Sequence, residues 1–212
     1  MTDVTVFGPL HSTYLRSIRL ALEEKGVDYA VEPVEMKQPS HLELHPFGRV
    51  PAFRHGDFQL YESMAIMAYV DGAFDGPALM PSDPRQRARM IQWLSICACY
   101  FDADVTRRYI VATMFAKDGE RDMDAINAAL VDVRHHLGVT EATLNETPYL
   151  AGEALSLADL MLLPMMFYVS RMPEGDELLS EQPALAKWLA RMSERPSFTA
   201  TLPPPPPSQA AA

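Results

Sequence analysis

The stretch Phe47-Gly48-Arg49-Val50-Pro51-Ala52-Phe53, followed by Tyr61-Glu62-Ser63-Met64-Ala65, decides the fold of the first part of the chain. Two short apolar runs are separated by the turn-prone pair Gly56-Asp57, which predicts a β-hairpin. Because proline has no N–H to donate, Val50 is expected where the strand pairing stops. Its own N–H and C=O would then be free to pair with an extended peptide.

The residues after the hairpin predict a helix. Met64 to Val70 contains no helix breaker and follows directly on Glu62-Ser63. Ser63 is therefore expected in the first helical turn, where free N–H groups and a hydroxyl can hold a carboxylate. Glu62 beside it can hold an ammonium group. The whole stretch suits a small molecule with an amino-acid end and a peptide backbone.

Composition limits the classes of partner. The chain has 212 residues with 48% hydrophobic and 22% charged content, which is ordinary for a globular protein with one large or two small cores. A net charge of −10 without a basic stripe argues against nucleic acid. The N-terminus lacks a signal-peptide pattern, and no apolar run is long enough to span a bilayer. We expect a cytoplasmic protein with no nucleic-acid or membrane partner.

The residues before and after the quoted stretch predict an α/β domain. Val4 to Phe7 predicts a strand, Leu15 to Lys25 a helix and Val27 to Val34 a second strand. A polar connection from Glu35 to Pro46 predicts a loop or a short irregular helix, and the hairpin and a helix to about Phe74 complete the domain. The order predicts a thioredoxin-like fold of βαβαββα type with a mixed sheet, over residues 1–76.

The second half predicts helices alone. A proline-rich linker at 77–84 leads into an all-α helical bundle at 85–199, and residues 200–212 predict a flexible proline-rich tail. Ser156 and Asp159 have the spacing of a capping box at a helix start, to which we assign no chemistry.

Two motifs carry a resemblance to a known family. Gly48-Arg49-Val50-Pro51 and Glu62-Ser63 resemble the glutathione-binding signature of cytosolic glutathione transferases, and the stretch from Trp188 to Phe198 resembles the family's C-terminal pattern. The chain looks most like bacterial, serine-type, phi- or theta-like members, and the resemblance runs from Val4 to about Phe198. It implies a cis peptide bond at Pro51, a Val50 backbone that pairs with the cysteinyl unit of glutathione, and a Glu62-Ser63 pair that holds the γ-glutamyl end.

The resemblance also indicates the catalytic hydroxyl. Ser12 stands between the first strand and the first helix, where a hydroxyl and free N–H groups converge, although a plain helix cap would have the same position. Phi-like and theta-like relatives place their activating serine here with an arginine four residues later, and Ser12 with Arg16 is similar to that pattern. Thr13 and Tyr14 are alternatives as the donor.

Further binding residues are expected on the same grounds. His41 and Arg49 are expected near the glycyl carboxylate of glutathione, with His45 as a weaker rival to His41. The electrophile pocket is expected to be apolar. Its candidate residues are Leu10, Tyr14, Tyr109, Met114 and Phe115.

The expected function is that of a detoxifying glutathione S-transferase. A hydrogen bond from Ser12 would activate the thiol of glutathione for attack on a small apolar electrophile. Glutathione would be a co-substrate, no metal is expected, and the family resemblance implies a homodimer. The alternatives are a binding protein for glutathione or a hydrophobic ligand with little catalysis, and a specialised glutathione-dependent dehalogenase, isomerase or lyase.

Overall fold

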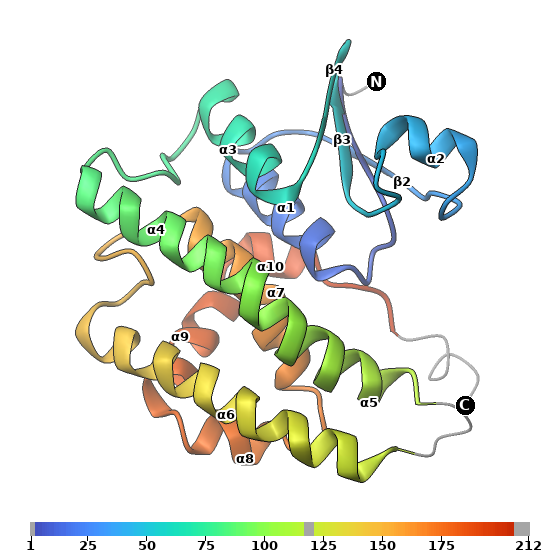
Figure 1. Ribbon diagram of the computed structural model, residues 1–212. Helices are drawn as coiled ribbons and strands as arrows, with labels where there is room; N and C mark the ends of the chain where they lie inside the picture. The colour runs from blue at the N-terminus through green and yellow to red at the C-terminus, as the bar shows by residue number, and fades with distance from the viewer. Residues whose placement is uncertain (1–2, 117–120, 206–212) are drawn as a thin grey trace. The chain divides into compact units, whose positions relative to one another are not determined.

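The computed structural model describes residues 3–116 and 121–205 (Figure 1). Its internal contacts divide the chain into two compact units. Unit 1 comprises Met1–Ala78 together with Glu194–Ala212, and unit 2 comprises Leu79–Ser193. No helix in the described ranges combines the length and apolarity needed to cross a membrane.

Unit 1 is built on a four-stranded mixed sheet with the strand order β2-β1-β3-β4. The strands are β1 (Val4–Phe7), β2 (Ala30–Glu32), β3 (Ala52–His55) and β4 (Phe58–Tyr61). β1 pairs in parallel with β2 and antiparallel with β3, and β3 pairs antiparallel with β4. Every residue of the central β1 is buried, as its β-branched and aromatic composition leads one to expect. The predicted mixed sheet and βαβαββα order are confirmed.

Helices cover the sheet of unit 1 on both sides. α1 (Thr13–Glu24) and α3 (Ser63–Ala73) pack against each other on one side, and the short α2 (Pro39–Leu44) lies on the other side (Figure 1). α1 is amphipathic and buries Leu15, Ile18 and Leu22, the residues whose spacing predicted it. These helices place the two ends of the candidate site, at the starts of α1 and α3.

The C-terminal segment belongs to unit 1 rather than to the helical half. The short α10 (Pro196–Ala200) packs on α1, whereas the sequence pattern predicts that the helical domain extends to residue 199. Glu24 on α1 accepts two hydrogen bonds from Arg195, at 2.7 and 2.6 Å, and a third from Ser197. Arg19 donates to the carbonyl oxygens of Ala200 and Thr201. Charged residues of α1 are therefore paired with residues of this segment. Part of the predicted tail, 206–212, lies outside the described residues.

Unit 2 is helical, as predicted. One long helix runs as α4 (Pro84–Ile96), continues in the wider π form as η1 (Cys97–Val111) and ends as α5 (Ala112–Met114), and Figure 1 shows it as an unbroken ribbon. It is followed by α6 (Met123–Glu146), α7 (Leu157–Val169), α8 (Gly175–Ser180) and α9 (Pro183–Ser193). All 13 residues of α7 are buried, and all but Asp159 are apolar or aromatic, which makes this helix the centre of unit 2.

The capping box at the start of α7 is confirmed. Asp159 accepts hydrogen bonds from the Ser156 amide at 3.0 Å and the Ser156 hydroxyl at 2.8 Å. It also accepts from the Leu150 amide and from the Trp188 indole on α9. Burial raises the pKa of the Asp159 carboxyl, and these hydrogen bonds oppose that rise. The box therefore ties α7 to two neighbouring segments and has a structural role.

We expect the Glu24→Gln substitution to lower the free energy of unfolding by about 2 kcal/mol at neutral pH, because charge-assisted hydrogen bonds to Arg195 are lost. Although burial opposes it, the hydrogen bonds from Arg195 and Ser197 lower the pKa of Glu24. The stabilisation should therefore be present above the unfolded pKa of about 4.3 and vanish as the pH falls through the folded value. Urea unfolding of both proteins at several pH values measures this difference.

The matched control is Glu43→Gln, because Glu43 is an exposed carboxylate on α2. It should change the free energy of unfolding by less than about 0.5 kcal/mol at every pH. A loss in Glu24→Gln that stayed the same in acid would mean that the lowered pKa of Glu24 does not contribute to stability.

Candidate active site

Ser12 is the N-cap of α1. Its backbone is extended, with φ −68° and ψ 125°, and its Oγ accepts a hydrogen bond from the Leu15 amide at 3.3 Å. The Ser12 amide donates to the carbonyl of Pro9 at 3.0 Å, which closes the loop after β1. The side chain is half-buried. Ser12 thus presents a hydroxyl at the positive end of the α1 dipole.

The two alternative donors have different environments. Thr13 is the first residue of α1 and is buried, and Tyr14, one position further into the helix, is half-buried. Arg16, the arginine four residues after Ser12, is also buried. Its guanidinium donates to the Phe198 carbonyl at 3.3 Å and lies over the Phe198 ring at 4.6 Å. Arg16 therefore holds α1 against the C-terminal segment.

The Val50-Pro51 peptide bond is cis, as the resemblance implied. Val50 is half-buried and precedes Ala52, the first residue of β3, so it lies outside the strand pairing. Within the described residues its N–H and C=O make no backbone hydrogen bond. The backbone of Val50 is accordingly available for pairing with another extended chain.

Gly8 brings the loop after β1 close to Val50. Its φ is +147°, a conformation that side chains rarely adopt, and a Cβ added there would lie 2.9 Å from Leu15 and 3.2 Å from Val50. A glycine is therefore required for this close approach. The contact places the loop that carries Ser12 next to Val50.

His41 has a different environment from the one predicted. Its side chain is 1% exposed, its Nδ1 accepts from the Lys37 amide at 3.0 Å and its Nε2 lies 2.8 Å from the Arg49 carbonyl. Since a carbonyl only accepts, Nε2 carries the proton and donates it to Arg49. Both ring nitrogens are occupied, so His41 holds the backbone before Val50 in place. Arg49 itself is exposed.

Glu62 and Ser63 form the start of α3. Glu62 is the N-cap and has a positive φ of 72°, which is uncommon for a residue other than glycine. The first helical bond runs from the Ile66 amide to the Glu62 carbonyl, at 3.0 Å, so the amides of Ser63, Met64 and Ala65 have no partner within the helix. Ser63 itself is 7% exposed. These groups together form an anion-binding end beside the Glu62 carboxylate.

His45, the weaker rival to His41, has an environment that the sequence did not predict. It is 2% exposed, and its Nε2 lies 4.0 Å from Glu62 Oε1. Its ring lies 4.9 Å from the Tyr61 ring and 6.3 Å from the Phe47 ring. Burial lowers the pKa of His45, and the Glu62 carboxylate opposes this shift.

The predicted pocket residues have unequal exposures. In unit 1, Leu10 is 37% exposed and Tyr14 is half-buried. In unit 2, Phe115 is 64% exposed and Met114 is half-buried. Phe115 and Met114 therefore both have accessible apolar surface.

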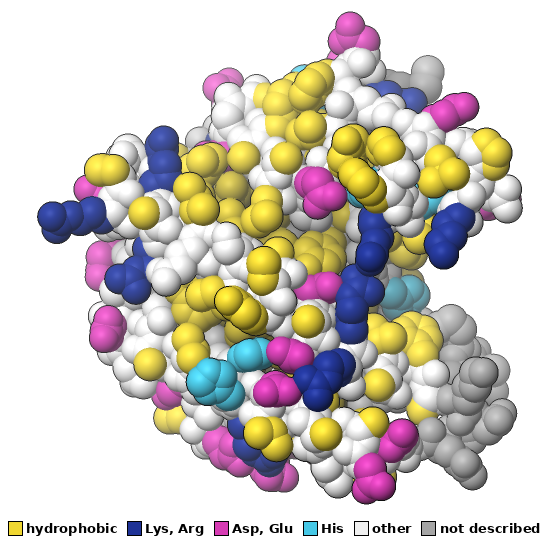
Figure 2. All heavy atoms as spheres, viewed as in Figure 1, with side chains coloured by type: hydrophobic (Ala, Val, Ile, Leu, Met, Phe, Trp, Pro, Cys, Tyr) yellow, Lys and Arg dark blue, Asp and Glu magenta, His cyan; other side chains and the backbone are white. Residues whose placement is uncertain are grey.

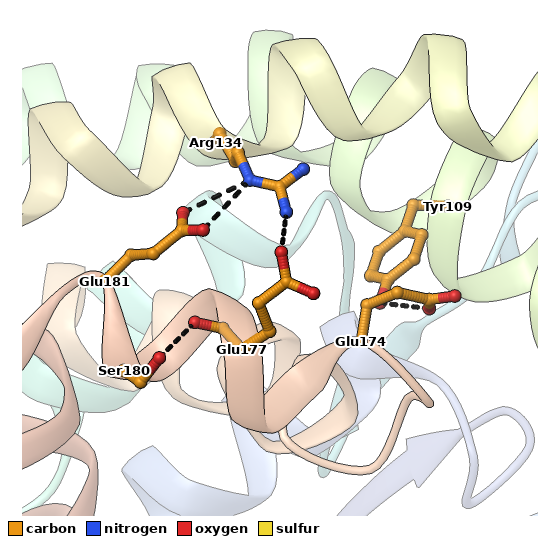
Figure 3. Close-up of polar contacts among 6 residues, drawn as sticks. All are labelled: Tyr109, Arg134, Glu174, Glu177, Ser180 and Glu181. Atoms are coloured by element: carbon orange, nitrogen blue, oxygen red, sulfur yellow. Dashed lines mark hydrogen bonds and ion pairs between the residues drawn. The ribbon is translucent and has the colours of Figure 1, made fainter.

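Tyr109 instead belongs to the core of unit 2. It is fully buried, and its hydroxyl donates to Glu174 at 3.0 Å (Figure 3). Burial raises the pKa of Tyr109, and the hydrogen bond to Glu174 adds to the rise. The same figure shows Arg134 paired with Glu177 and Glu181, which ties α6 to α8. This environment differs from the one expected for a pocket residue.

No metal site accompanies these groups in the part of the chain that the structure covers. There, no three His, Cys, Asp or Glu side chains are grouped so that they could hold a metal ion. The chemistry that the described groups offer is hydrogen bonding and charge pairing along an extended, amino-acid-like ligand.

Comparisons with known proteins identify the family. Residues 2–72 match the family model of the glutathione S-transferase N-terminal domain, and residues 98–196 match that of the C-terminal domain. A probable glutathione S-transferase of rice, GSTF1, is 33% identical over 93% of this chain and 94% of its own length.

Two solved structures have the same fold. Glutathione S-transferase I from maize, in complex with an atrazine glutathione conjugate, has a TM-score of 0.85 at 29% identity, over 94% of this chain and 96% of that one. A theta class glutathione S-transferase from Xanthomonas axonopodis pv. citri, with glutathione bound, has a TM-score of 0.83 at 30% identity, over 95% and 97% of the chains.

The chain belongs to the glutathione S-transferase family. It is an enzyme of that family, with a thioredoxin-like first domain, a helical second domain and glutathione as its substrate.

We expect the Gly8→Ala substitution to lower the free energy of unfolding by about 1–3 kcal/mol and to raise the KM for glutathione, because the added methyl group displaces Leu15 or Val50 and the positive φ is strained. Gly72→Ala is the matched control. Gly72 lies within α3 with open space around its missing Cβ, so this change should stabilise by about 0.5–1 kcal/mol. Urea unfolding and glutathione kinetics measure both effects. An unchanged KM in Gly8→Ala would show that Val50 does not depend on this contact.

Proposed function

We propose that this glutathione S-transferase activates the thiol of glutathione with a hydrogen bond from Ser12. The observation that carries the proposal is the position of Ser12 at the open N-terminus of α1, next to the loop that Gly8 holds against Val50. Glutathione bound along Val50 would bring its sulfur to this hydroxyl. Thr13 and Tyr14 are less suitable donors, because Thr13 is buried and Tyr14 lies further inside the helix.

The helix cap and the catalytic role are compatible. A serine hydroxyl has one proton to donate and two lone pairs to accept. Ser12 uses a lone pair to accept from the Leu15 amide, and its proton has no acceptor within the described residues. Ser12 can therefore cap α1 and donate to a thiolate at the same time.

The required energy is within reach of this arrangement. The thiol of glutathione, like that of free cysteine, has a pKa near about 8.5, and lowering it by about two units requires about 2.7 kcal/mol. A hydrogen bond to a charged group contributes about 1.5–3 kcal/mol, and the positive end of a helix adds about 0.3–1 kcal/mol. Ser12 and the N-terminus of α1 supply both contributions.

The rest of glutathione would be held by the groups described above. The Val50 backbone before cis-Pro51 would pair with the cysteinyl unit. The Ser63 hydroxyl and the first amides of α3 would bind the carboxylate of the γ-glutamyl end, and the Glu62 carboxylate would bind its ammonium group. The exposed Arg49 is suited to the glycyl carboxylate, whereas His41 supports this loop through its bonds to Lys37 and Arg49.

The second substrate is proposed to be a small apolar electrophile. Leu10, Tyr14, Met114 and Phe115 offer accessible apolar surface of the kind that such a molecule prefers. The maize relative that was solved with an atrazine glutathione conjugate supports this class of substrate. Family membership favours conjugation over the binding-protein alternative, and no observation favours a specialised dehalogenase, isomerase or lyase.

The class of the enzyme within the family is proposed on the same grounds. A serine-type, phi- or theta-like enzyme is supported by Ser12 and by relatives of both kinds. The bacterial origin that the resemblance suggested stays a prediction, since the rice relative and the Xanthomonas enzyme are similarly close. A cytoplasmic location also stays a prediction, with which the free Cys97 and Cys99 agree.

Ser12→Ala tests the mechanism. We expect kcat/KM with a generic aryl halide to fall about 100-fold, the equivalent of about 2.7 kcal/mol. The pKa of the bound glutathione thiol, followed by the ultraviolet absorbance of the thiolate, should return towards about 8.5. Thr13→Val and Tyr14→Phe are the matched controls and should keep both values. Full turnover in Ser12→Ala, with loss in either control, would transfer the role to that residue.

We also propose a homodimer in which the hairpin and α3 of one subunit contact the long helices of the other. Both regions have exposed apolar side chains. Figure 2 shows such side chains on the viewed face over each unit. The exposed apolar side chains of the two regions include Phe58 and Met64 in unit 1, and Ile91 and Tyr100 in unit 2. Apolar surface of this kind is typical of a protein interface.

Sedimentation velocity tests the dimer, and the wild-type protein should sediment at twice the mass of the 23.7 kDa chain. The double variant Phe58→Asp/Ile91→Asp should sediment as a monomer, because charges in a buried interface are costly. Met36→Asp, which alters an exposed methionine outside the proposed interface, should remain dimeric. A monomeric wild type at micromolar concentration would contradict the proposal.

A further inference from the structure

His45 is buried at the edge of the glutathione site without a complete set of partners. It ends α2, and its ring is enclosed by the rings of Tyr61 and Phe47. Its Nδ1 is buried and has no hydrogen-bond partner among residues 3–116 and 121–205. A buried imidazole normally satisfies both nitrogens, so this arrangement is costly and calls for a functional reason.

The other ring nitrogen faces Glu62. The distance of 4.0 Å between His45 Nε2 and Glu62 Oε1 is too long for a hydrogen bond but is at the limit of an ion pair. The backbone of Glu62 is fixed at the start of α3 with a positive φ, which limits where its side chain can go. The Glu62 carboxylate is 65% exposed, so it can turn outward to a ligand or inward to His45.

The other groups around His45 do not offer a second anion. The titratable or charged groups that face it are His41 from α2, Arg49 from the following loop, Tyr61 from β4 and Glu62 from the start of α3. His41 uses both its nitrogens elsewhere, and Arg49 is a cation. A proton added to His45 would therefore be balanced by the Glu62 carboxylate.

We propose that His45 is a positioning residue for Glu62 and makes the affinity for glutathione dependent on pH. A neutral His45 leaves the Glu62 carboxylate free for the ammonium group of the γ-glutamyl end. A protonated His45 pairs with the same carboxylate and competes with that ammonium group. The inference rests on the proposed function, in which Glu62 binds the ammonium group.

The direction of the effect follows from linkage. Burial keeps the pKa of His45 below its ordinary value, so the ring is neutral at pH 7 and above. The ammonium group of glutathione next to Glu62 lowers that pKa further, because two cations then share one carboxylate. Binding should therefore weaken as the pH falls through the pKa of His45 in the free enzyme, and binding in that range should release a proton.

Isothermal titration calorimetry with S-methylglutathione tests this inference, because the probe has no thiol and its binding does not report thiol ionisation. We expect the Kd of the wild-type enzyme to rise about three- to tenfold more between pH 7.5 and 5.5 than that of His45→Asn, the equivalent of a pKa difference of about 0.5–1 unit. Titrations in buffers of different ionisation enthalpy should show the released proton only in the wild type.

Two further variants serve as controls. His45→Gln, a second neutral replacement, should behave like His45→Asn and protects the test if one of them folds poorly. His55→Asn removes a histidine of β3 that bonds to Tyr69, and it should keep the wild-type dependence on pH. The wild-type enzyme should bind an analogue of S-methylglutathione that lacks the amino group with a Kd that depends on pH as weakly as the Kd of His45→Asn for S-methylglutathione. This measurement needs no substitution.

The outcomes separate this inference from the proposed function. Glu62→Gln should weaken the binding of S-methylglutathione at pH 7.5, and unchanged binding would overturn the proposed role of Glu62. If Glu62→Gln weakens binding while His45→Asn and His45→Gln retain the full dependence on pH and the proton release, the role of His45 is overturned and that of Glu62 stands.

Discussion

The close approach of Gly8 to Val50 is the contact on which the site depends. It is possible because residue 8 has no side chain and can adopt a φ of +147°. On one side of the contact is the loop that ends in Ser12 at the start of α1. On the other side is the cis peptide bond before β3. The hydroxyl that is proposed to act on sulfur and the backbone that is proposed to hold the peptide therefore belong to adjacent loops.

Supporting residues hold this arrangement from several directions. His41 joins the start of α2 to the carbonyl of Arg49, directly before Val50. Gln59 on β4 donates to the carbonyls of Glu43 and Leu44, which holds the end of α2 against the sheet. These bonds hold the backbone around the proposed glutathione site. His41 and Gln59 thus hold the backbone of this site in a fixed position, as supporting residues do in other preorganised sites.

The sequence predicted those features that depend on local chemistry. The capping box of Ser156 and Asp159 and the strand and helix order follow from short-range patterns. The cis peptide bond at Pro51 is implied by the resemblance of Gly48-Arg49-Val50-Pro51 to the family signature. The environments of His41, Tyr109 and His45 could not be predicted in this way. Each depends on partners that approach from other elements, as with Tyr109 and Glu174, which are 65 residues apart. Burial and pairing of a polar residue depend on the tertiary structure, for which a single sequence gives no local signal.

The pairing of α1 with the C-terminal segment has a consequence for how the protein is made. Unit 1 leaves off at Ala78 and is completed only from Glu194 onward, so a ribosome must release nearly the whole chain before Arg195 can reach Glu24. Until then Arg16, Arg19 and Glu24 lack the hydrogen-bond partners that the C-terminal segment supplies in the finished protein. The thioredoxin-like unit is thus expected to mature late in synthesis, although it is encoded first, and a fragment that ends at residue 78 would lack part of its own core.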